Sequence, residues 1–550
     1  MLTAARKKGK GSLVCKLVVL AVLIGLVFVP VIKMFSVLTM QDIRDVFTSQ
    51  RLVPALLNSL SLTAIATVIV IILAYALAWC IERTDIKLKG LFGIILVLPM
   101  LIPSISHGMG LIILLGRNGI ITNLLGVDSG FIYGKIGIIA GSVMYAFPVA
   151  FIILADVLRY EDRSVYQAAD ILGIDKKCRF ARITLPFLRK PLIAATFSVF
   201  AMIVTDYGVP LMIGGTTKTV SLLMYEEVIS QLKFGRGCVY GILLLIPAIV
   251  AFVTDMLNKD RAGMAFVKRT DSKRVSRARN ALAYTVCILV SVLALLPILA
   301  FVILAFVKSY PNDMSFTLDN IINTMQMRGG GKYLLNSLLI AFAAATLGTV
   351  IGFLTAYLTS RCRSALSKLI HMIVLAFMAI PGIVLGLSYA ITFTGMKEVF
   401  VIFFALIMVN VAHFVASPYL MMYNTFGKMN ENLEPVGETL GIGRIRMLRD
   451  IFIPMSFGTV LEMFSYLFVN CMMTISAVSF IANNETYPIS LMINKFEAQM
   501  QYESVAVVSL SILLVNLALK AVIALIKKNA FNYRQNKKKR YKNELDKKAV

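Results

Sequence analysis

The sequence contains few of the residues that usually carry enzymatic chemistry. Only three of its 550 residues are histidines, and neither an H-E-x-x-H metal site nor a G-x-S-x-G nucleophile elbow occurs. The seven cysteines are scattered, with no C-x-x-C pair and no spacing typical of a metal site, so we interpret them as packing residues. We therefore predict that this chain has no catalytic residue and no metal site.

A phosphate-binding loop of the form G-x-x-x-x-G-K-[ST] is also missing. The stretches GGTTKT (214–219) and GGGKY (329–333) contain similar residues, but they lack that spacing and do not open a soluble strand–helix unit. We interpret both as external turns. Any ATP that drives this protein would therefore be bound by another polypeptide.

Acidic residues are scarce relative to basic ones, with 29 Asp and Glu against 55 Lys and Arg, and the formal net charge is +26. The basic residues concentrate near residues 6–10, in the stretch 259–279 and in the C-terminal tail, each beside an apolar run. Under the positive-inside rule, all three clusters are expected in the cytoplasm. Topogenic charge and attraction to anionic membrane lipid explain them, so we predict no nucleic-acid partner.

Apolar residues dominate the rest of the sequence. The hydrophobic content is 58% and the mean hydropathy is +0.82, which is more apolar surface than soluble cores could bury. A helix needs about 20 consecutive apolar residues to cross the hydrocarbon core of a bilayer. Twelve such runs lie near residues 13–37, 53–81, 90–116, 134–158, 190–212, 237–257, 279–307, 333–360, 366–394, 398–425, 455–481 and 502–527. We therefore predict an all-α membrane protein with about 12 transmembrane helices, whose runs at 90–116 and 190–212 are kinked or broken by Pro and Gly.

The second half of the chain repeats the first. The matching pairs are NSLSL (58–62) with NSLLI (336–340), Arg83 with Arg361, Gly173 with Gly441, and Pro186 with Pro454. The change of offset between early and late pairs places an extra external loop at 116–135. We predict a first half at 1–257, a basic cytoplasmic linker at 258–279, a second half at 280–527 and a basic cytoplasmic tail at 528–550. Because each half has an even number of spans, the halves are parallel repeats with a pathway between them.

Two long polar loops, 160–186 and 428–454, interrupt the apolar runs at matching positions of the two halves. Joining two helices takes only a handful of residues, so their length calls for another role. Gly173 permits a sharp turn, and Pro186 suits the first turn of the next span, where its missing N–H is tolerated. We interpret each loop as a docking segment connected to a membrane helix.

The spacing in these loops resembles the E-A-A-x3-G-x9-I-x-L-P signature of permease subunits of bacterial ATP-binding-cassette (ABC) importers. The matching residues are Gln167, Ala168, Ala169, Gly173, Ile183, Leu185 and Pro186 in the first copy, and Val436, Gly437, Gly441, Ile451 and Pro454 in the second. The second copy departs from the signature, with Pro435-Val436-Gly437 in place of E-A-A and Ile453 in place of Leu. The resemblance implies that each loop forms a coupling helix seated on one of two ABC ATPase subunits.

The resemblance extends over nearly the whole chain and is to fused double permeases, similar to those for 2-aminoethylphosphonate, ferric iron and thiamine. The segments TDYGVPLMIGG (205–215) and VSLLMYEEVISQLKFGRGCVYGILLLIPAIVAF (220–252) favour 2-aminoethylphosphonate, with ferric iron second. The resemblance implies a type I importer fold and a multi-pass location in the bacterial plasma membrane with both termini cytoplasmic. It also implies an extracellular or periplasmic solute-binding protein as partner, membrane lipid around the spans, and ATP and Mg²⁺ held by the partner ATPase rather than by this chain.

Polar residues inside the apolar runs are candidates for the transport pathway, because a charge near the middle of a membrane is costly and tends to face a cavity or a partner. The candidates are Asp206, Tyr207, His413, Glu462 and Asn470. Asp206 is the first choice, since it precedes a Tyr-Gly-Val-Pro sequence that favours a broken helix. For Glu462, gating or pairing between helices and a merely structural role all stay open.

Two other classes of protein share some of these features. An ion-gradient-driven secondary transporter with two six-helix repeats would match the span count and the parallel halves. Such a carrier does not require the paired long loops and works without an ATPase. A membrane enzyme or scaffold would be expected to show a catalytic constellation or a large soluble domain.

Overall fold

The structure is a computed structural model that describes residues 2–126, 130–159, 161, 164–258, 277–396 and 398–549. Most of the predicted basic linker at 258–279 lies outside the described residues, as do residues 160, 162 and 163 of the first polar loop. The predicted tail at 528–550 continues the last helix as far as Ala549.

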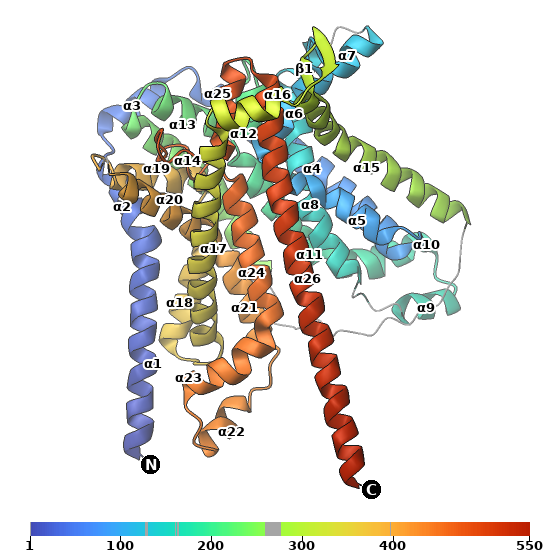
Figure 1. The fold of residues 1–550 in the computed structure, drawn as a ribbon, viewed down its shortest axis with the longest axis vertical. Helices are drawn as coiled ribbons and strands as arrows, with labels where there is room; N and C mark the ends of the chain where they lie inside the picture. Colours follow the sequence, from blue (N-terminus) through green and yellow to red (C-terminus); the bar gives the residue numbers. More distant parts are fainter. Residues whose placement is uncertain are drawn as a thin grey trace.

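Helices form nearly all of the described chain (Figure 1). Ten of them, within the described ranges, are long and apolar enough to cross a membrane, and counting two bent pairs as one span each brings the number to twelve. In the first half the spans involve α1 (Leu2–Leu23) with α2 (Val29–Ser36), α4 (Leu52–Arg83), α6 (Ser104–Leu115) with α7 (Ile120–Leu125), α8 (Lys135–Arg159), α11 (Leu185–Val204) and α14 (Phe234–Asn258). In the second half they involve α15 (Arg277–Phe306), α17 (Gly330–Ser360), α18 (Ala365–Phe377) with α19 (Gly382–Thr392), α20 (Val399–Phe414) with α21 (Ala416–Gly427), α24 (Ile453–Met473) and α26 (Tyr502–Ala549). The predicted all-α membrane fold is confirmed.

Shorter elements connect or interrupt these spans. The remaining α-helices are α3 (Met40–Thr48), α5 (Lys89–Val97), α9 (Ser164–Ile171), α10 (Lys176–Arg179), α12 (Gly208–Ile213), α13 (Val220–Ile229), α16 (Asp319–Ile322), α22 (Leu433–Thr439), α23 (Arg444–Met447) and α25 (Ile489–Ala498). Turns of 3₁₀- or π-helix occupy η1 (Ile24–Phe28), η2 (Leu98–Leu101), η3 (Gly130–Ile132), η4 (Phe180–Thr184), η5 (Asn323–Met327) and η6 (Leu448–Phe452). Strands β1 (Val307–Ser309) and β2 (Asp313–Phe316) pair antiparallel, with Val307 opposite Phe316.

Proline marks the breaks in the third span of each half. Pro103 and Pro381 occupy equivalent positions of the repeat and cap the N-termini of α6 and α19. A proline removes a backbone donor and disfavours a helical residue before it, so the preceding helix ends there. The axes of α18 and α19 consequently differ by 101°. In the fifth span of the first half, the expected break separates α11 from the short helix α12.

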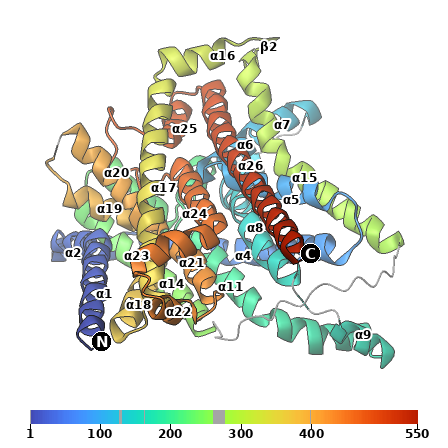
Figure 2. The same ribbon diagram turned by 60° about the horizontal axis from the view of Figure 1, so that its bottom comes forward.

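The first span of each half packs against the other half. Helix α2 lies against α19, and α1 contacts α17 and α18, whereas α15 packs against α4, α5 and α6 (Figures 1 and 2). Ala283 and Cys287 of α15 are fully buried in a cluster whose other buried members, apart from Val290 and Ala294 of the same helix, come from the first half. The two halves are therefore interlocked rather than placed side by side.

The repeated N-S-L sequence forms the same hydrogen-bonded clasp in each half. The Asn58 side chain donates to the Lys218 carbonyl (3.1 Å), and the Ser59 hydroxyl accepts from the Val220 N–H (2.8 Å). The corresponding bonds of the second half join Asn336 to the Glu485 carbonyl (2.9 Å) and Ser337 to the Ile489 N–H (2.7 Å). Each clasp holds the start of the helix that follows the fifth span, α13 or α25.

Candidate functional site

A cavity of about 380 Å³ lies between the two halves. Its walls come from α8, α11 and α14 of the first half and from α19, α20, α21 and α24 of the second. The polar lining residues are Tyr145, Ser198, Thr205, Asp206, His413, Ser417, Tyr466, Asn470 and Ser476. Among the described residues that line it, there is one carboxylate and no Lys or Arg. The cavity therefore brings together three of the five pathway candidates, Asp206, His413 and Asn470.

Asp206 lies where the fifth span ends. Its carboxylate accepts a hydrogen bond from the Ser104 hydroxyl (2.6 Å) and another from the Val209 N–H (3.0 Å). The Asp206 carbonyl accepts from the Ser221 hydroxyl (2.8 Å). These bonds satisfy backbone groups that the break between α11 and α12 exposes, as non-helical backbone at membrane depth requires. Asp206 thus stabilises the break and also faces the cavity.

His413 lies near the end of α20 and approaches the backbone of Gly382. A Cβ atom at Gly382 would lie 2.7 Å from the His413 Nε2 and 2.7 Å from the Ser476 hydroxyl, so only glycine leaves room for both side chains. The His413 Nδ1 is buried and makes no hydrogen bond with any described residue. Asn470 donates to the Tyr466 carbonyl (2.7 Å), and the Tyr466 hydroxyl donates to Ser417 (3.2 Å).

Tyr207 does not line this cavity but joins the two halves beside it. Its ring stacks on Tyr225 with centroids 4.5 Å apart, and its hydroxyl reaches the Ile475 carbonyl of the second half (3.5 Å). Asn494, also in the second half, donates to the Tyr225 hydroxyl (3.1 Å). Burial raises the pKa of Tyr225, so this hydroxyl stays protonated at neutral pH. Tyr207 is positioned to hold the halves together.

Glu462 also lies away from the cavity. Its carboxylate accepts a hydrogen bond from Lys527 of α26 (2.5 Å), and 60% of its side chain is exposed. Of the roles left open for Glu462, the geometry favours pairing between helices.

The two polar loops have the same backbone design. In the first, α9 ends before Gly173, which has φ +65°, and in the second α22 ends before Gly441, which has φ +69°. Glycine adopts this left-handed conformation without the steric penalty of a side chain. The next residue donates back to the helix in each case, from Ile174 to the Ala169 carbonyl (3.0 Å) and from Ile442 to the Gly437 carbonyl (2.8 Å).

After the turn, each loop continues through a short helix and a π-helical turn into the fifth span. Ile183 lies in η4 and Ile451 in η6, while Leu185 and Pro186 begin α11 and Pro454 lies in the first turn of α24. Each polar loop is thus continuous with a fifth span.

The residues at the E-A-A positions of the signature lie in two environments. Gln167, Ala168 and Val436 are exposed, whereas Ala169 and Gly437 are buried at equivalent positions. A Cβ atom at Gly437 would lie 2.4 Å from the Met447 sulfur. In the second loop, the glycine at the third position of E-A-A therefore packs against α23.

An arginine from the second span anchors each loop. Arg361, at the end of α17, pairs with Glu434 of α22 through its Nε (2.5 Å) and through a second contact, and it donates to the Asn430 carbonyl (2.7 Å). Its side chain is only 5% exposed. The equivalent Arg83, at the end of α4, forms an ion pair with Glu161 and stacks on the Tyr166 ring (4.8 Å).

Exposed apolar side chains cluster in both loops. Ile171 and Leu172 are 86% and 74% exposed. In the second loop, Leu440 and Ile445 are 69% and 87% exposed. Helix α22 lies at the lower end of the molecule in Figure 1, where both termini also lie, whereas α9 lies at the right at about mid-height; the two helices are well apart in both views (Figures 1 and 2). Each loop therefore presents its own exposed apolar surface, which we call its apolar knob.

Sequence reasoning missed several residues of these sites. Tyr145 and Tyr466 line the cavity, but a tyrosine within an apolar run resembles any packing residue. Glu161 and Glu434 gave no local signal, because the arginine that each contacts is more than 70 residues away in the chain. The repeat of Arg83 in Arg361 was the one sequence feature that could have pointed to these anchors.

Comparisons with known proteins agree with this geometry. The family described as "Binding-protein-dependent transport system inner membrane component" matches residues 71–259 and again 348–531, once in each half. A ferric transport system permease protein of Haemophilus influenzae is 24% identical over 466 residues, which cover 81% of this chain and 73% of that protein. One from Actinobacillus pleuropneumoniae is 24% identical over 78% of this chain and 64% of its own length.

Single-unit relatives match about one half of the chain. A molybdenum transport system permease of Azotobacter vinelandii is 26% identical over 38% of this chain and 94% of its own length. Among solved structures, a bacterial alginate ABC transporter crystallised with its periplasmic protein aligns with 42% of this chain and 86% of its own, at 16% identity and a TM-score of 0.35. With the family matched in both halves, the chain belongs to the inner-membrane components of binding-protein-dependent transport systems and is a fused double permease of an ABC importer.

Proposed function

We propose that this chain forms the translocation pathway of an ATP-driven importer and couples that pathway to two separate ABC ATPase subunits. The observation that carries the proposal is the duplicated loop. Each half presents a short helix, a left-handed glycine and a helical connection to its fifth span.

Each loop would dock in a groove of one ATPase subunit through its exposed apolar side chains. Closure of the two ATPases on ATP and Mg²⁺ would push the loops, and the π-helical turns would transmit the push to α11 and α24. Those two helices contribute Asp206 at the end of α11 and Asn470 within α24 to the cavity, so their movement would change its access. This chain would supply the loops and the helices α11 and α24 that move, and the partner would hydrolyse ATP.

The direction of transport follows from the family. An extracellular or periplasmic solute-binding protein would deliver the substrate to the end of the molecule opposite α22, where α12, α25 and the β-hairpin lie (Figure 1). The end that carries α22 and both termini would face the cytoplasm, as the basic residues near both ends of the sequence favour. The long loops and the family match favour this importer over a gradient-driven carrier.

For the substrate, we propose ferric iron as the first candidate. Two relatives that match most of this chain are named ferric transport permeases. The cavity is compatible with a cation, since its described lining offers the Asp206 carboxylate, hydroxyl groups and no Lys or Arg. Hard cations prefer such oxygen ligands. The 2-aminoethylphosphonate interpretation rests on the sequence of residues 205–215 and 220–252 and is second.

The coupling proposal is tested by replacing Gly173 or Gly441 with Glu in the reconstituted complex. Each substitution puts a side chain on a left-handed residue and a charge in the apolar knob, so we expect ATPase assembly or coupled uptake to be lost. The control is Gly427→Ala at the end of α21, where a Cβ atom would meet nothing within 4 Å, and this variant should transport normally. Normal uptake in both glutamate variants would refute the assignment.

The substrate is tested separately with the cognate binding protein, recovered by gentle-detergent affinity purification of the tagged permease. Titration of that protein with ferric iron and with 2-aminoethylphosphonate, followed by uptake of the bound ligand into proteoliposomes, compares the two candidates. Tight binding of the phosphonate alone would reverse our order of preference without affecting the coupling proposal.

A further inference from the structure

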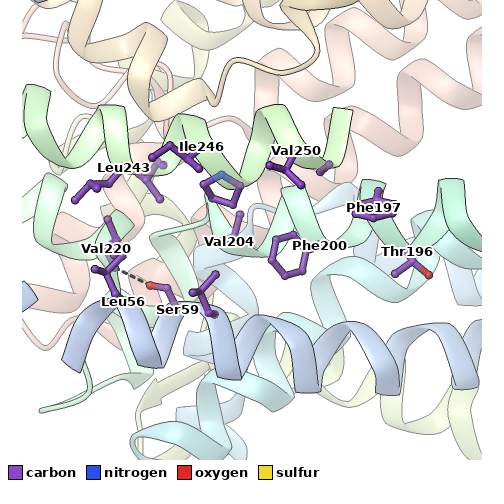
Figure 3. Close-up of a pocket in the computed structure, with 14 residues that line it drawn as sticks. Leu56, Ser59, Thr196, Phe197, Phe200, Val204, Val220, Leu243, Ile246 and Val250 are labelled. Atoms are coloured by element: carbon purple, nitrogen blue, oxygen red, sulfur yellow. Dashed lines mark hydrogen bonds between the residues drawn. The ribbon is translucent and has the colours of Figure 1, made fainter. Parts of the chain in front are cut away.

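A second cavity, of about 420 Å³, lies within the first half between α4, α11, α13 and α14 (Figure 3). We call it the lateral groove. Its volume is in the range of small-molecule binding sites. Phe197 and Phe200 of α11 face Ile246 and Val250 of α14 across it, and Leu56 of α4 lies on the third side.

The wall of the lateral groove offers almost nothing to a polar ligand. Its lining includes two hydroxyl groups, those of Ser59 and Thr196. The Ser59 hydroxyl is engaged, since it accepts the Val220 N–H at 2.8 Å (Figure 3). Ordered water needs two to four polar partners, so water would be poorly held in such a space. The occupant must therefore be apolar.

The rim of the lateral groove opens away from the protein. Leu60, Ile246 and Val250 line the groove and are 47%, 56% and 56% exposed. All three lie inside helices that are long and apolar enough to span the membrane, Leu52–Arg83 and Phe234–Thr254. The medium that meets these residues is the hydrocarbon of the bilayer, so the material available to fill the groove is a lipid chain.

The inner end of the lateral groove reaches the transport pathway. Phe197 and Ala251 line both the lateral groove and the cavity between the halves. Phe197 belongs to α11, the fifth span, which carries Asp206 at its end. Only the shared residues Phe197 and Ala251 therefore separate a ligand in the lateral groove from the cavity between the halves. The ligand also contacts α11, the helix that follows the first polar loop.

We propose that the lateral groove binds one acyl chain of a membrane phospholipid, whose inner part rests against Phe197 and Ala251. The acyl chain fills the space between α11 and α14 that protein side chains leave empty. Removing it leaves unfilled contacts along α11, because a void deprives its lining of dispersion partners. The bound lipid thus packs directly behind residues that line the cavity between the halves.

The proposal is tested by photo-crosslinking of the full-length permease in nanodiscs that contain phosphatidylcholine with a diazirine at mid-chain. We expect crosslinks on Phe200 and Leu243 of the lateral groove to exceed those on Leu289 and Leu293 of α15, which are exposed apolar residues outside this groove. We also expect the groove crosslinks to persist after detergent has stripped the annular lipid. Equal labelling of groove and α15, lost together on stripping, would overturn the proposal.

A matched pair of variants makes the test specific. Val250→Trp fills the lateral groove, whereas Val253→Trp adds the same bulk to an exposed position of α14 outside its lining. We expect several-fold weaker groove labelling in the first variant and wild-type labelling in the second. Leu60→Trp fills the groove from α4 and replaces Val250→Trp if that variant does not fold. Unchanged labelling in a folded groove-filling variant would also refute the proposal.

Discussion

The anchor between Arg361 and Glu434 makes the sharpest prediction about stability. Arg361 is 5% exposed and Glu434 21% exposed, and the arginine also donates to the carbonyls of Met429 (3.1 Å) and Asn430 (2.7 Å). Removing one partner of a buried ion pair leaves the other uncompensated and costs about 3–5 kcal/mol. Because a fifth of Glu434 stays in contact with solvent, we expect Arg361→Gln to destabilise α22 by about 3 kcal/mol, at the lower end of that range.

Hydrogen–deuterium exchange of the permease in nanodiscs measures the loss of stability of α22 at its own amide groups. Amide groups of α22 and its turn, such as those of Leu440 and Ile442, are protected by hydrogen bonds within the loop. A loss of about 3 kcal/mol corresponds to roughly 100-fold more frequent local opening, since each 1.4 kcal/mol is a factor of ten. We expect exchange in 433–442 to rise by that order, with exchange in α24 unchanged.

The chain offers a matched control two residues away. Arg363 pairs with Glu431 at 2.8 Å, but these side chains are 75% and 72% exposed. Surface pairs of this kind contribute about 0–1 kcal/mol, so Arg363→Gln should leave exchange in α22 nearly unchanged. A double variant, Arg361→Met with Glu434→Leu, removes both charges and should recover much of the protection. Equal exchange in Arg361→Gln and Arg363→Gln would refute the anchor.

Three further substitutions separate structural from pathway roles. Gly437→Ala should destabilise the second loop by about 1 kcal/mol through its clash with Met447, measured by exchange in 433–447, and Met447→Ala in the same chain should restore it. Asp206→Asn should lose one of its two side-chain hydrogen bonds, at about 1–3 kcal/mol, and should slow uptake in proteoliposomes. Glu462→Gln should leave uptake near the wild-type rate, because Glu462 lies outside the cavity; a loss as large as that of Asp206→Asn would show that the cavity is incomplete.

Local features of this protein could be predicted well from local sequence. The apolar runs determine the spans, because crossing a bilayer demands a helix of about 20 apolar residues whatever its neighbours are. Pro103 and Pro381 interrupt the third spans for reasons that involve only adjacent residues. Gly173 and Gly441 adopt positive φ angles at the positions where the loop signature places its glycine.

Contacts between distant segments could not be predicted in the same way. The N-S-L repeat was visible in the sequence, but its Asn and Ser side chains form hydrogen bonds with backbone groups about 150 to 160 residues away, and these partners could not be predicted. The polar lining of the cavity was predicted only at Asp206, His413 and Asn470. Residues such as Tyr145, Ser198 and Tyr466 cannot be distinguished by sequence from packing residues in apolar spans.

By itself, the sequence determined an all-α membrane protein of two parallel repeats with a polar loop at the same point of each. These properties follow from hydropathy, from proline and glycine positions and from internal repetition, which are all written in the order of residues. Only the tertiary structure decided that α1–α2 and α15 pack on opposite halves, that Arg361 holds the second loop through Glu434, and that Glu462 lies away from the cavity. Helix packing and charge pairing depend on which faces meet in three dimensions, and similarly apolar faces on many spans leave that choice open until the chain folds.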